Sequence, residues 1–266
     1  MADPTPYEIY AIKYAEHDRR AAENFIGGDP HNGPMPLDYF VWAIKGPAKT
    51  WVLDTGFDFE VGQRRQRRVL RSPADGLSLL GIDPGKIEDV IISHMHYDHC
   101  GNHRLFEQAR FHVQDKEMLF ATGRCMCFEP MRHAFDVDDV VKMVRRVFAG
   151  RVTFHDGDEE IAPGLSVHHV GGHTMGLQMA RVWTKRGWVV LASDASHFYA
   201  NMEQVRPFPI VYNVADMLAG HRRAYELASS RQHVIPGHDP LVMARYPAPT
   251  PELRGIVARL DVEPSQ

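Results

Sequence analysis

Three histidines and one aspartate fall within six consecutive residues of this chain, His94-Met95-His96-Tyr97-Asp98-His99. The segment follows the apolar stretch 89–93, which we predict to be a short buried strand. Neutral imidazole nitrogens and carboxylate oxygens together suit zinc or a similar divalent ion. Residues i and i+2 of an extended segment point the same way, so we expect His94 and His96 to reach one ion. Asp98 and His99 follow after a turn and are expected to face a second ion. The alternative, a surface cluster of histidines, explains this density of ligands poorly.

Six residues cannot fill two coordination shells, so further ligands must come from later in the chain. Three candidates stand where an apolar stretch gives way to small residues: His173 after 167–170, Asp194 after 188–192 and His238 after 232–235. Glycine precedes two of them, in Gly171-Gly172-His173 and in Gly237-His238, and it lets the backbone come close to a site. We therefore predict that His173, Asp194 and His238 complete the metal centre.

The composition is that of a globular chain, with 266 residues of which 44% are hydrophobic and 24% charged. We expect a single domain over residues 1–266. A formal net charge of −4 argues against nucleic acid or an anionic membrane as a partner. Residues 1–6 contain no basic or apolar secretory signal, and three cysteines cannot form a disulfide framework. A cytoplasmic location is the expectation.

The order of the predicted elements favours two packed β-sheets with helices outside, rather than a doubly wound parallel sheet. Early strands have few helices between them, and later strands alternate with helices. The stretches 39–44 and 50–54 are apolar at most positions, so both faces of their sheet should be covered. Residues 16–37 are predicted to be a long substrate-side loop, and residues 115–149 a helical insertion interrupted near Gly123 and Pro130. The predicted strands are 7–14, 39–44, 50–54, 89–93, 110–114, 152–155, 167–170, 177–184, 188–192 and 232–235.

The motif His94-x-His96-x-Asp98-His99, followed by His173, Asp194 and His238, resembles the dinuclear metallo-β-lactamase superfamily over roughly residues 38–240. The resemblance implies an α/β fold, the αββα sandwich of two mixed β-sheets flanked by helices. It also implies a ligand set: His94, His96 and His173 on the first ion, Asp98, His99 and His238 on the second, and Asp194 between them. Asp54, in Asp54-Thr55-Gly56, matches a position that orients a ligand histidine.

Within the superfamily the chain is most similar to the N-acyl-homoserine lactonase group. The loop 16–37, Gly172-His173-Thr174 and Asp194-Ala195-Ser196 carry this similarity. It implies a quorum-quenching hydrolase with two divalent ions, expected to be zinc. Such an enzyme opens a lactone or related ester by attack of a metal-bridging hydroxide, and Asp98 is the expected proton carrier. The expected partners are a small lactone or ester and a second copy of the chain in a homodimer, with no nucleic acid and no membrane.

One departure from the group concerns the residue three positions after Asp194. The group commonly has a tyrosine there, whereas this chain has His197, with Tyr199 two residues on. Either side chain can donate a hydrogen bond to an oxyanion, so His197 and Tyr199 join Asp98 as catalytic candidates. A packed or surface histidine is the alternative for His197.

The substrate-binding candidates are apolar residues of the two insertions. We expect Phe25, Ile26, Met126 and Phe128 to line an acyl-chain channel, with ordinary packing as the alternative.

Two other functions remain open. The run Arg64, Arg65, Arg67, Arg68 and Arg71 is typical of a solvated helix face, but it would serve a phosphodiesterase or nuclease as a phosphate clamp. A non-catalytic module that senses a lactone through its metals is the third hypothesis.

Overall fold

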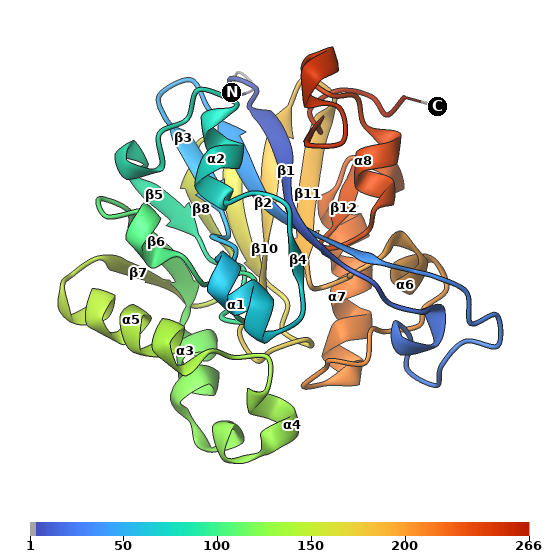
Figure 1. The fold of residues 1–266 in the computed structure, drawn as a ribbon. Coiled ribbons are helices and arrows are strands. Elements are labelled where there is room, and N and C mark those ends of the chain that lie inside the picture. The colour runs from blue at the N-terminus through green and yellow to red at the C-terminus, as the bar shows by residue number, and fades with distance from the viewer. Residues whose placement is uncertain (1–3, 266) are drawn as a thin grey trace.

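The computed structural model describes residues 4–265, which form two β-sheets packed face to face with helices on the outside (Figure 1). This is the predicted αββα arrangement. The first sheet has eight strands in the order β13-β1-β2-β3-β5-β6-β7, with β4 paired to β1, and the second has five in the order β12-β11-β10-β9-β8. The predicted single domain also includes residues 1–3 and 266, which lie outside the described residues, and its extent stays a prediction.

Both sheets mix parallel and antiparallel pairs. In the first sheet β1, β2 and β3 pair antiparallel, whereas β3, β5, β6 and β7 run parallel. In the second sheet β8 to β11 pair antiparallel and β12 runs parallel to β11. The strands are β1 Glu8–His17, β2 Leu37–Lys45, β3 Thr50–Leu53, β4 Arg68–Val69, β5 Asp89–Ile91, β6 Arg110–Gln114, β7 Val152–His155, β8 Glu159–Ala162, β9 Leu165–His169, β10 Gln178–Thr184, β11 Gly187–Ser193, β12 Val234–Pro236 and β13 Val257–Arg259.

Strand β2 shows why the sequence produces a sandwich. Its even-numbered side chains Phe40, Trp42 and Ile44 pack in the core between the two sheets. Its odd-numbered side chains Tyr39, Val41 and Ala43 pack in a second core with the helices over the first sheet. Successive side chains of a strand point to opposite faces, so a strand that is apolar throughout must be covered on both. The prediction that both faces are buried is confirmed.

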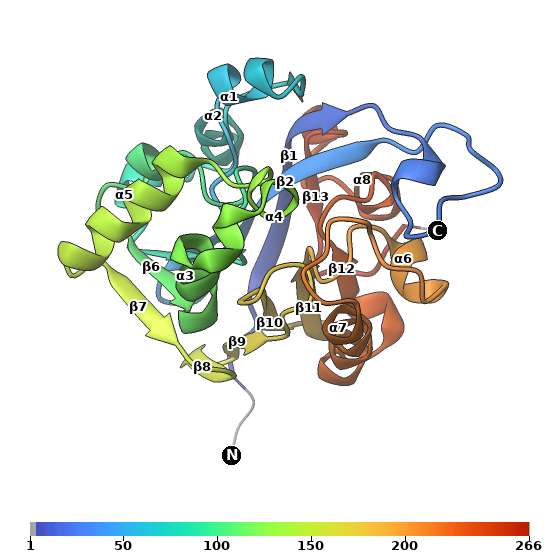
Figure 2. The same ribbon diagram turned by 90° about the horizontal axis from the view of Figure 1, so that it is seen from below.

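The helices divide between the outer faces (Figure 2). Leu77 of α2, Phe120 of α3 and Met143 of α5 pack in the second core, against the first sheet. Ala224 and Leu227 of α7 join the other core, and α7 contacts β11 of the second sheet. The α-helices are α1 Phe59–Arg64, α2 Pro73–Ser78, α3 Asp115–Thr122, α4 Glu129–Arg132, α5 Val137–Phe148, α6 Tyr199–Glu203, α7 Val214–Leu227 and α8 Leu241–Arg245. Short 3-10 turns occupy Ala21–Glu23, Pro84–Lys86, His103–Leu105, Arg124–Cys127, Arg231–His233 and Pro251–Leu253. No helix of the described residues is long and apolar enough to cross a membrane.

The helical insertion 115–149 consists of α3, a 3-10 turn, α4 and α5. Gly123 ends α3, as predicted, and Pro130 lies in the first turn of α4, where its missing N–H costs no hydrogen bond. The loop after β1 is shorter than predicted, because β1 continues to His17.

Residues 64–71 do not form the helix face that the arginine run suggested. Helix α1 ends at Arg64, Gln66 has a left-handed backbone with φ of 56°, and β4 follows at residues 68–69. The chain therefore reverses within the run, and successive arginines no longer share one surface.

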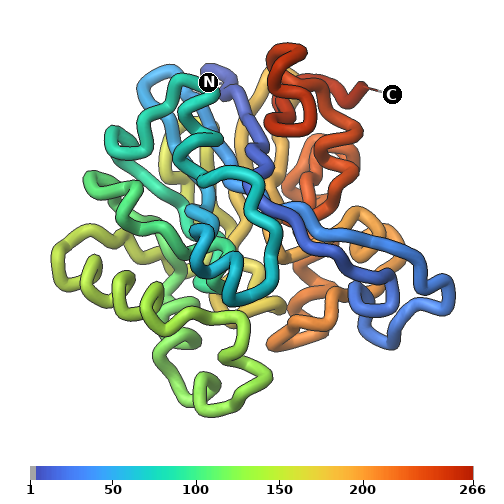
Figure 3. Tube along the Cα trace, viewed as in Figure 1, coloured from blue at the N-terminus to red at the C-terminus, as the bar shows by residue number. Residues whose placement is uncertain are grey.

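The candidate ligands leave the sandwich at a single edge. Asp54, His94, His173, Asp194 and His238 follow or end the strands β3, β5, β9, β11 and β12. The blue segment after β1 and the yellow-green insertion extend on opposite sides of this edge (Figure 3). The packed sheets thus supply the floor of the site, and the two insertions supply its walls.

The inter-sheet core should dominate stability. Leu191 on β11 is 0% exposed in that core, and Leu191→Ala should lower the free energy of unfolding by about 2–5 kcal/mol through lost burial and a cavity. Urea denaturation monitored by circular dichroism measures this change. Leu119→Ala is the matched control because Leu119 on α3 is 63% exposed, and it should stay within about 0.5 kcal/mol. Equal losses in both variants would contradict the assignment of the core.

Candidate metal centre

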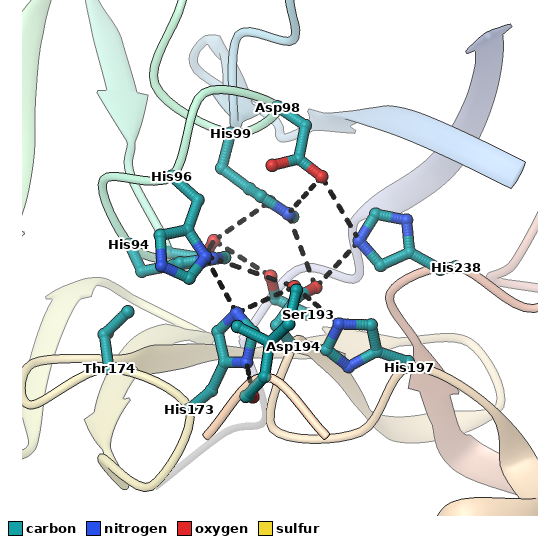
Figure 4. Close-up of polar contacts among 12 residues, drawn as sticks. His94, His96, Asp98, His99, His173, Thr174, Ser193, Asp194, His197 and His238 are labelled. Carbon is teal, nitrogen blue, oxygen red and sulfur yellow. Dashed lines mark hydrogen bonds and ion pairs between the residues drawn. The ribbon is translucent and has the colours of Figure 1, made fainter. Parts of the chain in front are cut away.

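The structure brings all seven predicted ligands together in one buried cluster (Figure 4). Six of them are at most 4% exposed, and Asp98 is 9% exposed. Their ligand atoms form two groups, and within each group all atoms lie within 4.8 Å of one another. One group contains His94, His96, His173 and Asp194, and the other contains Asp98, His99 and His238.

The Asp194 carboxylate lies between the two groups. Its Oδ2 is 3.2 Å from Nε2 of His173 and 3.7 Å from Nε2 of His94. Its Oδ1 is 3.0 Å from Nε2 of His238 and 3.4 Å from Nε2 of His99. One oxygen therefore faces each group, which is the placement that a bridging carboxylate requires.

Within each group the ligand atoms lie close together. Nδ1 of His96 is 3.1 Å from Nε2 of His94 and 2.9 Å from Nε2 of His173. On the other side, Asp98 Oδ2 is 3.6 Å from Nε2 of His99 and 3.8 Å from Nε2 of His238. These spacings leave a point in each group that several lone pairs face at once.

Hydrogen bonds on the far side of the rings fix which nitrogen faces the centre. Asp54 Oδ2 accepts from Nδ1 of His99 at 2.7 Å, so Nε2 points inward, as predicted for Asp54. The carbonyl oxygens of Ile210 and Asp38 accept from Nδ1 of His173 and His238 at 2.7 and 2.8 Å. Such partners fix the tautomer and orientation of a metal-binding imidazole.

The donor set fits divalent cations. His99 Nε2 and Asp194 Oδ1 are buried and have no hydrogen-bond partner among the described residues. Burial and neighbouring imidazoles hold the pKa of His94 and His96 well below the usual value, so both rings are neutral and offer a lone pair. Burial also lowers the pKa of His99, but the surrounding carboxylates of Asp194, Asp98 and Asp54 hold it well above the usual value. The same negative charge attracts a cation to this position.

A family model for the metallo-beta-lactamase superfamily matches residues 35–238. The chain belongs to this superfamily. An N-acyl homoserine lactonase from a Bacillus species is 29% identical over 135 residues, which cover 50% of this chain and 48% of that relative. The chain thus spans about half the length of this curated relative.

Solved structures of the superfamily share the fold. A quorum-quenching N-acyl homoserine lactone lactonase aligns with a TM-score of 0.74 and 20% identity over 90% of this chain and 95% of its own. A dizinc quorum-quenching lactonase in complex with a product aligns with a TM-score of 0.67 and 13% identity over 90% of both chains. The expected fold and the resemblance to the lactonase group are confirmed, and family membership supports the prediction of a metal-dependent hydrolase.

Two glycines leave room for close contacts at the ligand cluster. A Cβ on Gly237 would lie 2.7 Å from Asp194 Oδ1, and a Cβ on Gly172 would lie 2.5 Å from the backbone nitrogen of Met217 in α7. Glycine at 237 therefore gives Asp194 its room, and glycine at 172 lets the His173 loop approach α7. Both glycines stand in the turns that the sequence pattern singled out.

Glu117 on α3 is a buried carboxylate that sequence reasoning missed. Its Oε1 accepts from the backbone N–H of Met95 at 2.7 Å. Its Oε2 accepts from the Thr174 hydroxyl at 2.6 Å and from the backbone N–H of Gly176 at 3.0 Å. Glu117 therefore ties the loop of His94 and His96 to the loop of His173. A glutamate in a helix of mixed composition carries no local signal of this role.

The two catalytic candidates beyond Asp98 lie in different places. His197 lines the pocket, with Nε2 3.1 Å from Asp194 Oδ2 and its ring stacked on Phe208 at 3.6 Å. Tyr199 lies outside the pocket lining, in the inter-sheet core with Arg245 over its ring. Tyr199 begins helix α6, which turns its side chain from the site. The geometry therefore favours His197 over Tyr199.

The predicted acyl-chain residues do not line the pocket at the ligand cluster. Phe25 is buried beneath Arg206, whereas Ile26 and Phe128 are exposed. Met126 lines a neighbouring cavity of about 610 Å³. That cavity shares Arg65 and His133 with the pocket at the cluster, so it extends the pocket toward the helical insertion. Of the four candidates, the geometry favours Met126.

Loss of the Glu117 carboxylate should loosen the metal centre. In Glu117→Gln an amide replaces one acceptor oxygen, so the two ligand loops lose part of their shared anchor. Affinity for zinc should fall about 10- to 100-fold, as measured by chelator competition. Asp115→Asn removes an exposed negative charge from the same helix and should retain wild-type affinity. Equal affinities in both variants would contradict the anchoring role.

Proposed function

We propose that this chain is a dinuclear metal-dependent hydrolase of lactones or related esters. His94, His96 and His173 hold one divalent ion, Asp98, His99 and His238 hold the other, and Asp194 bridges them. Zinc is the expected metal, given the predominance of imidazole donors. The observation that carries the proposal is Asp194, which presents one carboxylate oxygen to each group of ligands.

The comparisons support the choice of reaction. Several relatives with matching sequence are N-acyl homoserine lactonases, and one structural neighbour is a dizinc lactonase. Two bound divalent ions would supply Lewis-acid activation of an acyl oxygen and a water of lowered pKa. A cytoplasmic location and a homodimer stay predictions.

The chain's own residues supply proton handling and orientation. Asp98 lines the pocket, and its Oδ2 lies between His99 and His238, so it is placed to accept a proton from attacking water and return it to the leaving oxygen. Burial lowers the pKa of His197 to about 3, so its ring is neutral. Its Nε2 is placed to donate to Asp194 or to a substrate oxygen nearby.

A substrate panel on protein with counted metals tests the function. The panel contains an N-acyl-homoserine lactone, a second lactone, a 4-nitrophenyl ester and a phosphodiester. We expect about two metals per chain and chelator-sensitive hydrolysis of lactones or esters. Metal-replete protein that turns over none of these esters would overturn the proposal, and binding of lactones without turnover would favour the sensing module.

Asp98→Asn tests the proton carrier. The amide is nearly isosteric but cannot take the proton, so kcat should fall about 10²-fold or more. Steady-state kinetics measures the fall, and circular dichroism checks the fold. Full activity in this variant would contradict the role of Asp98.

His197→Phe tests the oxyanion donor. Phenylalanine keeps the stack on Phe208 but removes the nitrogen, so kcat should fall about 10²-fold while metal content stays at the wild-type value. Elemental analysis provides the second readout. Loss of metal in this variant would instead identify His197 as a ligand, since His197 also forms a candidate group with Asp194 and His238.

Phosphodiester hydrolysis remains the second candidate because Arg65 and Arg67 line the pocket. The phosphodiester in the panel distinguishes the two reactions. Its turnover with lactones untouched would favour this candidate.

A further inference from the structure

The pocket beside the candidate metal centre contains three guanidinium groups that form no ion pair. Arg19, Arg65 and Arg67 line it, and none lies within 4.0 Å of a carboxylate oxygen in residues 4–265. Two other arginines of the same run behave differently. Arg64 pairs with Asp136 and Arg68 pairs with Glu16, both on the surface. On each side of Gln66, therefore, one arginine is paired at the surface and the other, Arg65 or Arg67, lines the pocket.

Arg67 is held in place but keeps donors free. Its Nε donates to the Tyr97 hydroxyl at 3.0 Å, and its Nη1 donates to the carbonyl of Arg65 at 2.6 Å. Nη2 has no hydrogen-bond partner within the described part of the chain. Tyr97 adjoins Asp98, so the free end of Arg67 lies close to the proposed reaction centre.

Arg65 contacts the same tyrosine as Arg67. It lies over the Tyr97 ring at 4.0 Å and donates from Nη1 and Nη2 to the carbonyls of His133 and Phe135 at 2.8 and 2.9 Å. Its Nε is buried and has no partner in residues 4–265. An unsatisfied charged donor in a buried position is costly, unless a ligand completes it.

The charges in this pocket do not balance without a ligand. Among residues 4–265, the carboxylates that line it are Asp98 and Asp194, which the proposed metals would neutralise. The charge of Arg19 is partly offset by Glu23, and that of Arg67 by Asp98, which is one of the two carboxylates that the proposed metals would neutralise. The pKa of His17 is lowered to about 4, first by burial and then by the positive charges of Arg67 and Arg19. An anion in the pocket would relieve this repulsion.

The pocket also has room for a group beyond the scissile bond. The space at the ligand cluster is about 60 Å³, and the adjoining cavity of about 610 Å³ shares Arg65 and His133 with it. Arg67 lines only the space at the cluster, Arg65 lines both spaces, and the far part of the larger cavity is lined by Glu129, Asp136 and Asp138. The positive charge is therefore concentrated at the end of the pocket nearest the cluster.

We propose that the pocket selects esters or lactones that carry a negative charge, and that Arg67 and Arg65 bind this anionic group while the acyl carbon lies at the metal centre. The anion is a carboxylate or a phosphate, which guanidinium groups bind alike. The inference rests on the proposed hydrolase function. Water supplies the oxygen that joins the acyl carbon and the proton that leaves with the alcohol, so no further reactant is needed.

A matched pair of esters tests the selectivity. Mono-4-nitrophenyl adipate has a free carboxylate, and its methyl ester has the same length and leaving group without the charge. For the metal-loaded wild-type protein, kcat/KM should be at least tenfold higher for the anionic ester, and added salt should reduce the ratio. A ratio near one, or a preference for the methyl ester, would overturn the proposal.

Arg67→Gln should reduce kcat/KM at least tenfold more for the anionic ester than for the methyl ester, chiefly through KM. Arg67→Lys should recover part of the ratio, because it restores charge without the planar donor group. Arg68→Gln is the control from the same run and should keep the wild-type ratio, since Arg68 is an exposed surface residue. An unchanged ratio in Arg67→Gln would contradict the role of Arg67.

Binding and phosphodiester measurements separate this proposal from the hydrolase proposal. Calorimetric titration of metal-loaded protein with adipate or inorganic phosphate should show at least tenfold weaker binding in Arg67→Gln, even if neither ester is hydrolysed. Equal binding in both proteins would overturn the anion site, whereas weaker binding without hydrolysis would overturn only the proposed function. Turnover of bis(4-nitrophenyl) phosphate that depends on Arg67 would identify phosphate as the anion.

Discussion

A buried carboxylate surrounded by imidazoles is the constraint on which this structure depends. Asp194 is 2% exposed, and one of its oxygens has no hydrogen-bond partner in residues 4–265. Burying a carboxylate is very costly unless cationic or hydrogen-bonding groups compensate it. Neighbouring rings of His99, His173, His197 and His238 hold its pKa well below the usual value, even though burial itself raises it. The fold therefore contains a concentrated negative site that positive charge stabilises.

The sandwich is what makes such a site possible. Parallel and antiparallel strands of two sheets end at one edge, so residues separated by more than a hundred positions meet there. Asp54 and backbone carbonyls fix the ring orientations, while the segments after β1 and after β6 form the walls. Chemistry and selectivity thus come from different parts of the chain.

Much of this was predictable, because the informative residues cluster locally. The residues His94 to His99 indicate the ligands, and the continuous apolar stretch 39–44 indicates a sheet buried on both faces. Small residues around His173 and His238 mark the turns. Other features depend on contacts that no local pattern records. The sequence analysis does not predict strands β4, β8 and β13, which are short. These segments are strands because they pair with neighbouring strands, and no local pattern shows that pairing. Glu117 and the pocket side of the arginine run became visible only when the chain reversal at Gln66 and the docking of α3 were known.

Glu117 limits which part of the helical insertion can change in length. Its helix opens the insertion, and its carboxylate joins both ligand loops, so the start of the insertion cannot shift without disturbing the ligands. Ala134 and Phe135 also contact the ligand loop, because the Tyr97 N–H donates to the Ala134 carbonyl and Phe135 pairs with His96. The stretch from Gly123 to Arg132 precedes these contacts, and it borders the larger cavity. Related chains are therefore free to lengthen or shorten this stretch alone, which would let them adopt new substrates while the reactive centre keeps its dimensions.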